Sequence, residues 1–290
     1  AKINLVLEAG ARRPDGYHEL ATVFQSIGLY DRVTISPSET HGELVVSGPQ
    51  QALGELGDYR RNLAWQAAEL IAEATGRADP GVHIHLEKNI PVSAGLGGGS
   101  SDAAAVLRVL ARRWGVDDRG LLFRLASELG SDVPFFLMRG TALGRGRGEI
   151  LSPLCLPRMW VVLANPGVAC STATVYSRFA ASGTASTGML GERCQETVQV
   201  LCTQGPAAVG RGWCNDLADA ARSEVPGIDS LLGAFYDLGA LGAQVSGSGA
   251  TVFAVARDAD HAESLWRQIV ARAARSWWGS TESEGGEADG

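Results

Sequence analysis

The sequence predicts a protein of mixed α and β structure, with strands and helices alternating along the chain. Ile3, Leu5 and Leu7 recur at every second position, as expected for a strand, and Val82–Leu86 repeats that pattern. Asn62–Ala74 instead places apolar residues at helical spacing and is soon followed by a glycine that ends a helix. With 290 residues, 45% of them hydrophobic, the chain is long enough for two modest packed units or one large one.

Composition excludes several classes of protein. The net charge of −7 disfavours broad binding to nucleic acid, and no apolar run approaches the roughly 18 residues of a membrane span. No signal peptide opens the chain, and the first residue is not methionine, so a few leading residues are expected to be missing. Five widely spaced cysteines form no Cys-x-x-Cys pair, which indicates reduced thiols in a cytoplasmic protein and argues against a zinc site.

The chain is organised around a glycine-rich segment between a predicted strand and a predicted helix. Its residues are Pro91, Val92, Ser93, Ala94, Gly95, Leu96, Gly97, Gly98, Gly99, Ser100 and Ser101. Glycine lets a ligand approach the main chain, and the first N–H groups of a helix have no partner within the helix. Because the helix dipole adds positive charge there, phosphate suits this position, and the serine hydroxyls can bond to phosphate oxygens or to Mg²⁺.

Taken alone, this segment has a second interpretation as a flexible turn with an ordinary serine cap. It is not a Walker A loop, because no Gly-Lys-Ser/Thr follows, and it does not match the Gly-x-Gly-x-x-Gly of dinucleotide folds. The pattern by itself therefore leaves both a phosphate site and a plain turn open.

The remaining elements are predicted in order along the chain. Strands are expected at Val33–Ile35, Leu44–Val46, Met159–Ala164 and Thr251–Val255, the first two as a hairpin or meander. Helices are expected at Gly120–Leu129, after a cap at Ser171, and at Asp258–Arg275. Ala181–Gly188 is interpreted as a loop or disordered insert, and the acidic, glycine-rich residues 279–290 as a disordered tail.

Several polar residues have both a structural and a functional interpretation. Tyr17 and His18 leave a Pro-Asp-Gly turn, where surface packing is the plainer alternative. Asp132 stands between a helix-ending glycine and an apolar stretch, where a cap is the plainer role. Gly247 and Ser248 precede a strand, where a tight turn would explain them.

Two other patterns suggest ligands but have plainer explanations. His83 and His85 lie on one face of a predicted strand, which suits a metal site or, more simply, a solvated face. The segment Gly140–Glu149 alternates glycines with Arg145 and Arg147, as in a second anion loop or a hairpin.

The glycine-rich segment resembles the ATP loop of the galactokinase–homoserine kinase–mevalonate kinase–phosphomevalonate kinase (GHMP) superfamily, Pro-x-x-x-Gly-Leu-Gly/Ala-Gly-Gly-Ser-Ser/Ala, with Ser93-Ala94 where glycines are frequent. Ala1–Leu5 with Asp15–Leu20 resembles the opening of one branch, whose members phosphorylate the 2-hydroxyl of a cytidine diphosphate sugar alcohol in the non-mevalonate pathway of isoprenoid biosynthesis. Gly130–Phe136, Asn215–Leu217 and Gly242–Phe253 are similar to later motifs of the superfamily.

This resemblance implies an α+β, two-domain GHMP kinase fold. A ribosomal-S5-like α/β domain that binds ATP would span residues 1–150, and a ferredoxin-like α/β domain would span residues 151–278. Members usually end on a further strand, for which the sequence after the last predicted helix shows no pattern. The resemblance also implies ATP and Mg²⁺ as cofactors and a small-molecule substrate, with no nucleic acid or membrane, acting as a monomer or weak homodimer.

For the chemistry, the resemblance implies that Asp132 accepts the proton of the attacked hydroxyl while Lys2 keeps that carboxylate charged. Backbone N–H groups of Gly95–Ser101 would hold the phosphates, with Ser100 or Ser101 as candidate ligands of Mg²⁺.

For the bound molecules, it implies a cytosine stacked between Tyr17 and Tyr176, with hydrogen bonds from Asn4 and His18. Gly247 and Ser248 would complete the substrate site close to the phosphates, and Asn62 with Leu63 would line an adenine slot.

Two alternatives remain at this point. One is another small-molecule GHMP kinase, acting on mevalonate or homoserine, and the other is a non-catalytic nucleotide-binding protein of the same fold. The Asp-Gly-Tyr-His element, which mevalonate and homoserine kinases lack, favours the cytidine diphosphate branch over the first alternative, whereas the atypical termini suggest the second.

Overall fold

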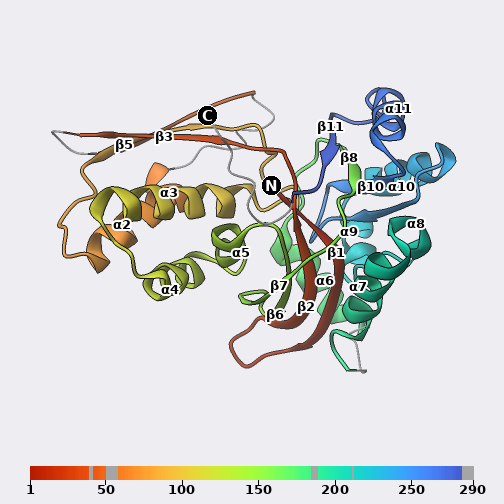
Figure 1. Ribbon diagram of the computed structural model, residues 1–290, viewed down its shortest axis with the longest axis horizontal. Helices are drawn as coiled ribbons and strands as arrows, with labels where there is room; N and C mark the ends of the chain where they lie inside the picture. The colour runs from red at the N-terminus through yellow and green to blue at the C-terminus, as the bar shows by residue number, and fades with distance from the viewer. Residues whose placement is uncertain (39–41, 50–57, 184–188, 211, 283–290) are drawn as a thin grey trace. The chain divides into compact units, whose positions relative to one another are not determined.

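The computed structural model of the chain describes residues 1–38, 42–49, 58–183, 189–210 and 212–282. Over these ranges the chain forms helices and strands in alternation, as the sequence predicts (Figure 1). In the described part of the chain, every helix is too short or too polar to cross a membrane.

The chain divides into two compact units that are not consecutive in sequence. The first unit contains Ala1, residues 29–92 and residues 97–138. The second contains residues 2–28, the short segment 93–96 and residues 139–290. The compact units therefore differ from the predicted division at residue 150, because the first two strands belong with the C-terminal half of the chain.

The described residues of the first unit form a three-stranded sheet, four α-helices and one 3-10 helix. Its elements are β3 (Arg32–Pro37), β4 (Glu43–Ser47), the 3-10 helix η1 (Tyr59–Arg61), α2 (Leu63–Ala74), β5 (Val82–Glu87), α3 (Gly98–Trp114), α4 (Arg119–Leu129) and α5 (Val133–Met138). Helices α2 and α3 pack side by side, and α4 and α5 pack against α3 (Figure 1). Asn62 begins α2, because its Oδ1 accepts a hydrogen bond from Ala64 N at 2.9 Å.

The strand order of this sheet is β3-β5-β4, so the hairpin predicted for the segments around Val33 and Leu44 is wrong. β5 lies between them and pairs antiparallel with β3 and parallel with β4. β5 is the central strand because it pairs on both sides, and its alternate residues are buried on one face of the sheet. The parallel partner is reached through the crossover that includes α2, a connection that local periodicity does not reveal.

The second unit contains two four-stranded antiparallel sheets. The first sheet has the order β1-β2-β6-β7, formed by β1 (Lys2–Arg12), β2 (His18–Ser26), β6 (Thr141–Gly146) and β7 (Ile150–Leu154). β6 and β7 form the hairpin that was one of the two interpretations of their glycine–arginine pattern. Leu7 N donates to Cys214 O and Asp216 N donates to Leu7 O, at 3.0 and 2.9 Å, which ties β1 to the C-terminal half.

The second sheet of this unit has the order β11-β8-β10-β9, formed by β8 (Trp160–Asn165), β9 (Gly242–Val245), β10 (Val252–Ala256) and β11 (Arg275–Ser280). Its helices are α6 (Thr172–Ser182), α7 (Glu192–Gln204), α8 (Pro206–Val209), α9 (Ala218–Glu224), α10 (Gly227–Asp237) and α11 (Ala259–Ile269). One buried cluster joins β1, β8 and β10 to helices α6, α9, α10 and α11, and it includes Leu7, Val162, Phe179 and Phe235. Helix α6 reaches Ser182, and residues 184–188 of the predicted insert lie outside the described residues.

Two predictions for the C-terminal end need correction. The last helix ends at Ile269 rather than Arg275, and Arg275–Ser280 forms strand β11, which pairs antiparallel with β8. The predicted tail therefore begins inside a strand, and residues 283–290 lie outside the described residues. Thr281 is buried as well, and its Oγ1 accepts from Met159 N at 3.0 Å. The serine, tryptophan and glycine residues of this segment do not form a clear strand pattern in the sequence. The segment forms a strand because it pairs with β8.

Candidate active site

The glycine-rich segment enters α3 without a capping side chain. Gly97 adopts a left-handed conformation with φ 68°, and the cap position supplies no side-chain hydrogen bond to the helix. The first backbone N–H groups of this 17-residue helix are therefore left for an external acceptor. Together with the helix dipole, this arrangement suits a phosphate group.

Ser101, in the same turn, donates its hydroxyl proton to Gly98 O at 2.7 Å. A hydroxyl has one proton and two lone pairs, so this bond leaves the Ser101 oxygen as an acceptor or a metal ligand. Leu63, at the start of α2, lies beside this turn, since a Cβ added at Gly99 would be 3.6 Å from Leu63 Cδ1. Leu63, which is predicted to border the adenine, therefore lies next to Gly99, which is predicted to bind phosphate, within the first unit.

The preceding part of the glycine-rich segment, residues 93–96, is seated on a turn of the second unit. Gly95 O accepts from Ser246 Oγ at 2.9 Å, and Thr251 N donates to Ala94 O at 3.2 Å. A Cβ added at Gly95 would lie only 2.0 Å from Ser246 O, and the residue has φ 77°. Glycine is therefore required here by both space and conformation.

Ser93 adopts a left-handed backbone conformation with φ 53°, which is unusual for a residue that has a side chain. Its carbonyl accepts from Cys170 N at 3.3 Å. The superfamily pattern often has glycine at this position, so the serine keeps the loop conformation at some cost in strain.

Lys2 lies in a buried polar chain on strands β1 and β2. Its Nζ donates to Asn4 Oδ1 at 2.6 Å, and Asn4 Nδ2 donates to Thr22 Oγ1 at 2.8 Å. Lys2 is 4% exposed, and its backbone N donates to Leu96 O at 3.0 Å. The lysine near the first residue is thus held by main-chain and side-chain bonds, although Asn4 is engaged with Lys2 and Thr22.

The glycine–serine turn before β10 lies beside Lys2. A Cβ added at Gly247 would be 3.2 Å from both Lys2 Nζ and Asn4 Oδ1, and 3.3 Å from Gly95 O. The structure therefore gathers four predicted site residues in the second unit, namely Lys2, Asn4, Gly95 and Gly247.

Asn215 holds this turn in place, a role that sequence reasoning did not assign. Its Nδ2 donates to Val245 O and to Gly247 O, at 2.9 and 2.7 Å. Ser248 is joined to Thr172 by a hydroxyl–hydroxyl bond of 2.9 Å. The Asn-Asp-Leu motif was visible in the sequence, but its partners lie about 30 residues further on, as the separations of 30 and 32 residues show.

Two aromatic rings from α6, those of Tyr176 and Phe179, pack against the His18 ring. The His18 ring lies 5.6 Å from that of Tyr176 with an interplanar angle of 30°, and Phe179 contacts it edge-on at 5.4 Å. His18 is 7% exposed, and its Nδ1 bonds to Gly10 O at 2.9 Å. A carbonyl only accepts, so Nδ1 carries the proton, and Nε2 is the acceptor when the ring is neutral. Tyr17, in contrast, is 52% exposed.

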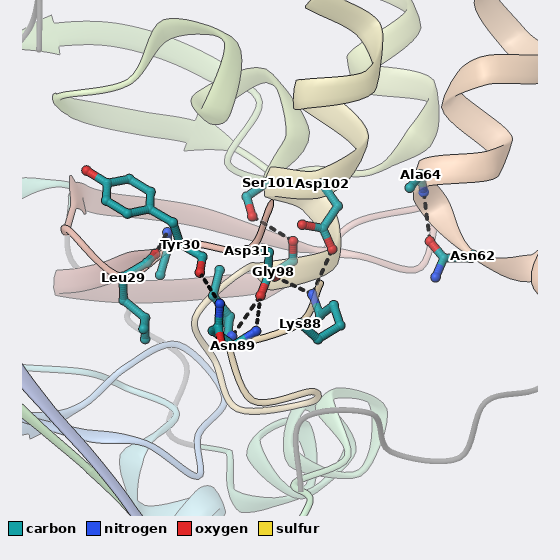
Figure 2. A network of polar contacts seen from close by, with 12 residues as sticks. Leu29, Tyr30, Asp31, Asn62, Ala64, Lys88, Asn89, Gly98, Ser101 and Asp102 are labelled. Atoms are coloured by element: carbon teal, nitrogen blue, oxygen red, sulfur yellow. Dashed lines mark hydrogen bonds and ion pairs between the residues drawn. The ribbon is translucent and has the colours of Figure 1, made fainter. Parts of the chain in front are cut away.

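Next to the first turn of α3 lies a network of buried charged side chains that the sequence analysis did not predict (Figure 2). Lys88 Nζ bonds to Asp31 Oδ2 and, at 2.7 Å, to Asp102 Oδ2. A Cβ added at Gly98 would lie 3.4 Å from Lys88 Nζ, so this ammonium adjoins the helix start. The side chains of Lys88, Asp31 and Asp102 are 6%, 1% and 3% exposed.

This network contains two carboxylates and one ammonium, which leaves an excess negative charge in a buried place. Burial raises the pKa of the Asp102 carboxyl to about 7, Lys88 opposes that shift, and the charge of Asp31 adds to it. Lys88 is 57 residues from Asp31 and 14 residues from Asp102 in the sequence. A local sequence pattern therefore could not predict this network.

Asp132 belongs to the first unit, where it lies half-buried in the turn between α4 and α5. Its predicted partner Lys2 belongs to the second unit, so their pairing remains a prediction. Of the two histidines on β5, His85 bonds through Nε2 to Ser47 Oγ at 2.8 Å, and His83 Nδ1 lies 3.6 Å from Glu43 Oε1. Among the described residues, no group of three or more His, Cys, Asp or Glu side chains is arranged to hold a metal ion.

The uncapped start of α3 suits a phosphate group, as expected for a small-molecule kinase, and two family models match the chain. The model for the GHMP kinases N terminal domain matches residues 62–140, and that for the GHMP kinases C terminal matches residues 206–275. GHMP kinases use ATP as the phosphate donor.

Comparison with known relatives indicates which branch of the GHMP kinases the chain resembles. The chain is 41% identical to 4-diphosphocytidyl-2-C-methyl-D-erythritol kinase of Streptomyces avermitilis over 93% of this chain and 91% of the relative. It is 44% identical to the kinase of the same name from Mycolicibacterium gilvum over 86% and 78%. A crystal structure of 4-(cytidine 5'-diphospho)-2C-methyl-D-erythritol kinase is 38% identical, with a TM-score of 0.80 over 99% of this chain and 98% of that one. The chain belongs to the 4-diphosphocytidyl-2-C-methyl-D-erythritol kinase family.

Replacement of Gly95 by alanine is expected to destabilise the protein and abolish ATP binding. The new Cβ would lie 2.0 Å from the Ser246 carbonyl oxygen, and alanine disfavours φ 77°. The strained conformation alone costs about 1–3 kcal/mol. Urea denaturation and calorimetry with a non-hydrolysable ATP analogue measure the two effects.

Gly99→Ala is the matched control for stability, because its Cβ would meet Leu63 Cδ1 at an ordinary 3.6 Å and alanine favours a helix. Equal stability of Gly95→Ala and the wild type would contradict the close approach at Ser246.

The titration of Asp102 is expected to make the protein less stable as pH rises from 3.8, the ordinary carboxyl value, to about 7. A folded-state pKa above the unfolded value means that the folded chain binds more protons in this window, so its stability falls with increasing pH. Asp102→Asn removes this titration. The free energy of unfolding of the wild type minus that of Asp102→Asn should therefore decrease across the window in urea denaturation, and a constant difference would refute it.

Proposed function

We propose that this protein transfers the γ-phosphoryl group of ATP to the 2-hydroxyl of 4-diphosphocytidyl-2-C-methyl-D-erythritol, in the non-mevalonate pathway of isoprenoid biosynthesis. The observation that carries the phosphoryl chemistry is the uncapped N-terminus of α3, which offers backbone donors to an anion. Family membership, with 41% identity over most of the chain, supports the choice of acceptor.

The phosphate groups of ATP would bind to the N–H groups that begin α3. Phosphoryl transfer depends mainly on positioning and on electrostatic stabilisation, so fixed backbone donors contribute to both. Two sets of contacts support this loop: residues 93–96 pack on the turn at Ser246, and the Lys88 ion pairs lie next to Gly98. Asn62 and Leu63, which begin α2, would border the adenine.

Asp132 would accept the proton of the attacked hydroxyl, and Lys2 would lie beside it. An ammonium close to a carboxylate favours its charged form and so keeps a base available at neutral pH. Lys2 is already desolvated and oriented by Asn4, which reduces the reorganisation needed when the acceptor binds.

The cytosine would stack on aromatic rings from the β1–β2 hairpin and α6, namely Tyr17 and Tyr176. His18, with Nδ1 bonded to Gly10 O, presents Nε2 as an acceptor that suits the exocyclic amine of cytosine. Because uracil has a carbonyl in that position, the same tautomer would disfavour it. Asn4 and the Gly247–Ser248 turn would contact the sugar alcohol and phosphates.

Mg²⁺ is expected to accompany ATP and to neutralise charge on its phosphates. It commonly keeps several waters and takes few protein ligands when substrate phosphates are present. Among the described residues, the Ser101 oxygen has lone pairs available and Ser100 adjoins it, which fits a metal held mainly by nucleotide and water.

We further propose a cytoplasmic location and action as a monomer or weak homodimer, without a nucleic-acid or membrane partner. All five cysteines are free thiols, and burial raises the pKa of Cys170 and of Cys194 and that of Cys214 to about 11. Buried thiols of raised pKa are poor nucleophiles, and free cysteines are common in proteins of a reducing compartment.

The direct test is ATP consumption in the presence of 4-diphosphocytidyl-2-C-methyl-D-erythritol, with the phosphorylated product identified by mass spectrometry. Turnover of mevalonate or homoserine instead would favour another GHMP kinase. ATP binding by calorimetry without turnover of any of these acceptors would favour a non-catalytic nucleotide-binding protein.

Asp132→Asn is expected to lower kcat by about 10²–10⁴, because it removes the proton acceptor and leaves the shape of the site. Asp117→Asn, at an exposed position of the same unit, should leave kcat unchanged and controls for general effects of charge removal. Wild-type kcat in Asp132→Asn would exclude this residue as the base.

A further inference from the structure

Two neighbouring hairpin tips of the first sheet in the second unit meet through Arg147 and Tyr17. Strands β2 and β6 are paired neighbours, with Leu20 opposite Gly146, so the β1–β2 tip lies beside the β6–β7 tip. Tyr17 lies at the first tip and Arg147 at the second. The Arg147 guanidinium carbon lies over the Tyr17 ring, 4.8 Å from its centroid, which is within cation–π distance.

Arg147 is itself held in place by Glu149 across the turn. Its Nε lies 3.6 Å from Glu149 Oε1, while its backbone N donates to Glu149 Oε2 at 2.6 Å. Gly146 and Gly148 have φ of 74° and 109°, and a Cβ at Gly146 would come within 2.9 Å of the Glu149 carboxylate. The glycines therefore give the turn a shape that brings Glu149 back onto Arg147.

Arg147 also differs from its neighbour in the same hairpin. Its side chain is 26% exposed, whereas Arg145 lies on the exposed face of β6. A long cationic side chain that is partly withdrawn from water keeps that position only if its contacts offset the lost hydration. Here the contacts are one carboxylate and one aromatic ring.

The turn that contains Tyr17 fixes the backbone of this residue but not its ring, so the contact with Arg147 is what orients the ring. Arg13 N donates to Tyr17 O at 2.6 Å, and Tyr17 N donates to Asp15 Oδ1 at 3.1 Å. The side chain is 52% exposed, so without Arg147 the ring would sample several rotamers. With a cation over one face, the opposite face is the one on which a planar base can stack.

We propose that Arg147, oriented by Glu149, is a positioning residue that preorganises the Tyr17 ring for stacking on the pyrimidine base of a nucleoside diphosphate. This inference rests on the proposed function and gives Arg147 and Glu149 a role that the sequence pattern did not assign to them. The guanidinium acts through the tyrosine: it limits the ring to one orientation, and base binding then loses less conformational entropy.

A direct contact between Arg147 and the diphosphate of the substrate is the rival explanation, and a double-mutant cycle separates the two. If Arg147 acts through Tyr17, its removal has no further effect once Tyr17 has been replaced. If it binds phosphate oxygens, its removal weakens binding by the same factor whether or not the tyrosine is present.

The experiment measures cytidine diphosphate binding by calorimetry in the wild type, Arg147→Ala, Tyr17→Ala and the double variant. We expect Arg147→Ala to weaken binding by about three- to tenfold, in line with the range for partly desolvated cation–π contacts. In the Tyr17→Ala background the same substitution should change the dissociation constant less than about twofold. In the kinase assay, KM for the cytidine substrate should rise with kcat and KM for ATP unchanged.

Two further variants make the result specific. Arg147→Lys keeps a cation near the ring and should restore part of the affinity, which a merely structural role would not predict. Arg145→Ala removes the same charge from the exposed face of the same hairpin and should bind cytidine diphosphate like the wild type. Unchanged far-UV circular dichroism and urea midpoints establish that the variants are folded.

Additive effects of Arg147→Ala and Tyr17→Ala would overturn the proposal in favour of a direct phosphate contact. Wild-type affinity in Arg147→Ala would overturn it as well while leaving the proposed function intact. If the wild type itself fails to bind cytidine diphosphate, both the inference and the proposed function fall.

Discussion

The close approach of Gly95 to the Ser246 carbonyl is the constraint on which the candidate site depends. A side chain at this position would lie 2.0 Å from that oxygen, so only glycine lets residues 93–96 rest on the turn before β10. From this contact the other placements follow. Leu96 O receives the backbone N–H of Lys2, and Gly247 comes within contact distance of both Lys2 and Asn4. A loop that appears flexible in sequence is thus immobilised by backbone packing over long sequence separations.

Charge burial shapes the site as much as backbone packing. Lys2 and Lys88 are both nearly inaccessible to water, at 4% and 5% exposure, a situation that is costly for an ammonium without polar partners. Lys88 is paired with two carboxylates, Asp31 and Asp102, and the pKa of Asp102 is raised mainly by burial and further by the charge of Asp31. The Lys2 ammonium donates to the neutral amide of Asn4. Lys88 therefore lies in an ion-pair network beside the start of α3, whereas Lys2 belongs to a chain of hydrogen bonds on β1 and β2.

The aromatic end of the site is built from preorganised rings. His18 is enclosed by Tyr176 and Phe179 and fixed by Gly10, whereas Tyr17 is exposed and contacted by Arg147 from the adjacent hairpin. Rings that are already oriented lose little entropy when a base binds, which favours selective recognition of a small planar ligand. The same sheet that carries Lys2 and Asn4 thus carries His18 and the hairpin tip with Tyr17, two residues that we propose contact the base.

The sequence by itself determined the elements with strong local patterns: strand β5, helix α2, the glycine-rich loop that leads into a helix, and the family of the chain. Only the tertiary structure decided which strands pair and which charges meet. β4 pairs with β5 rather than β3, β11 forms from a segment expected to be helix and tail, and Lys88 finds Asp31 from 57 residues away. The physical reason is that helix periodicity, caps and turns are set by residues a few positions apart. Strand pairing and buried ion pairs instead depend on which distant surfaces become desolvated together.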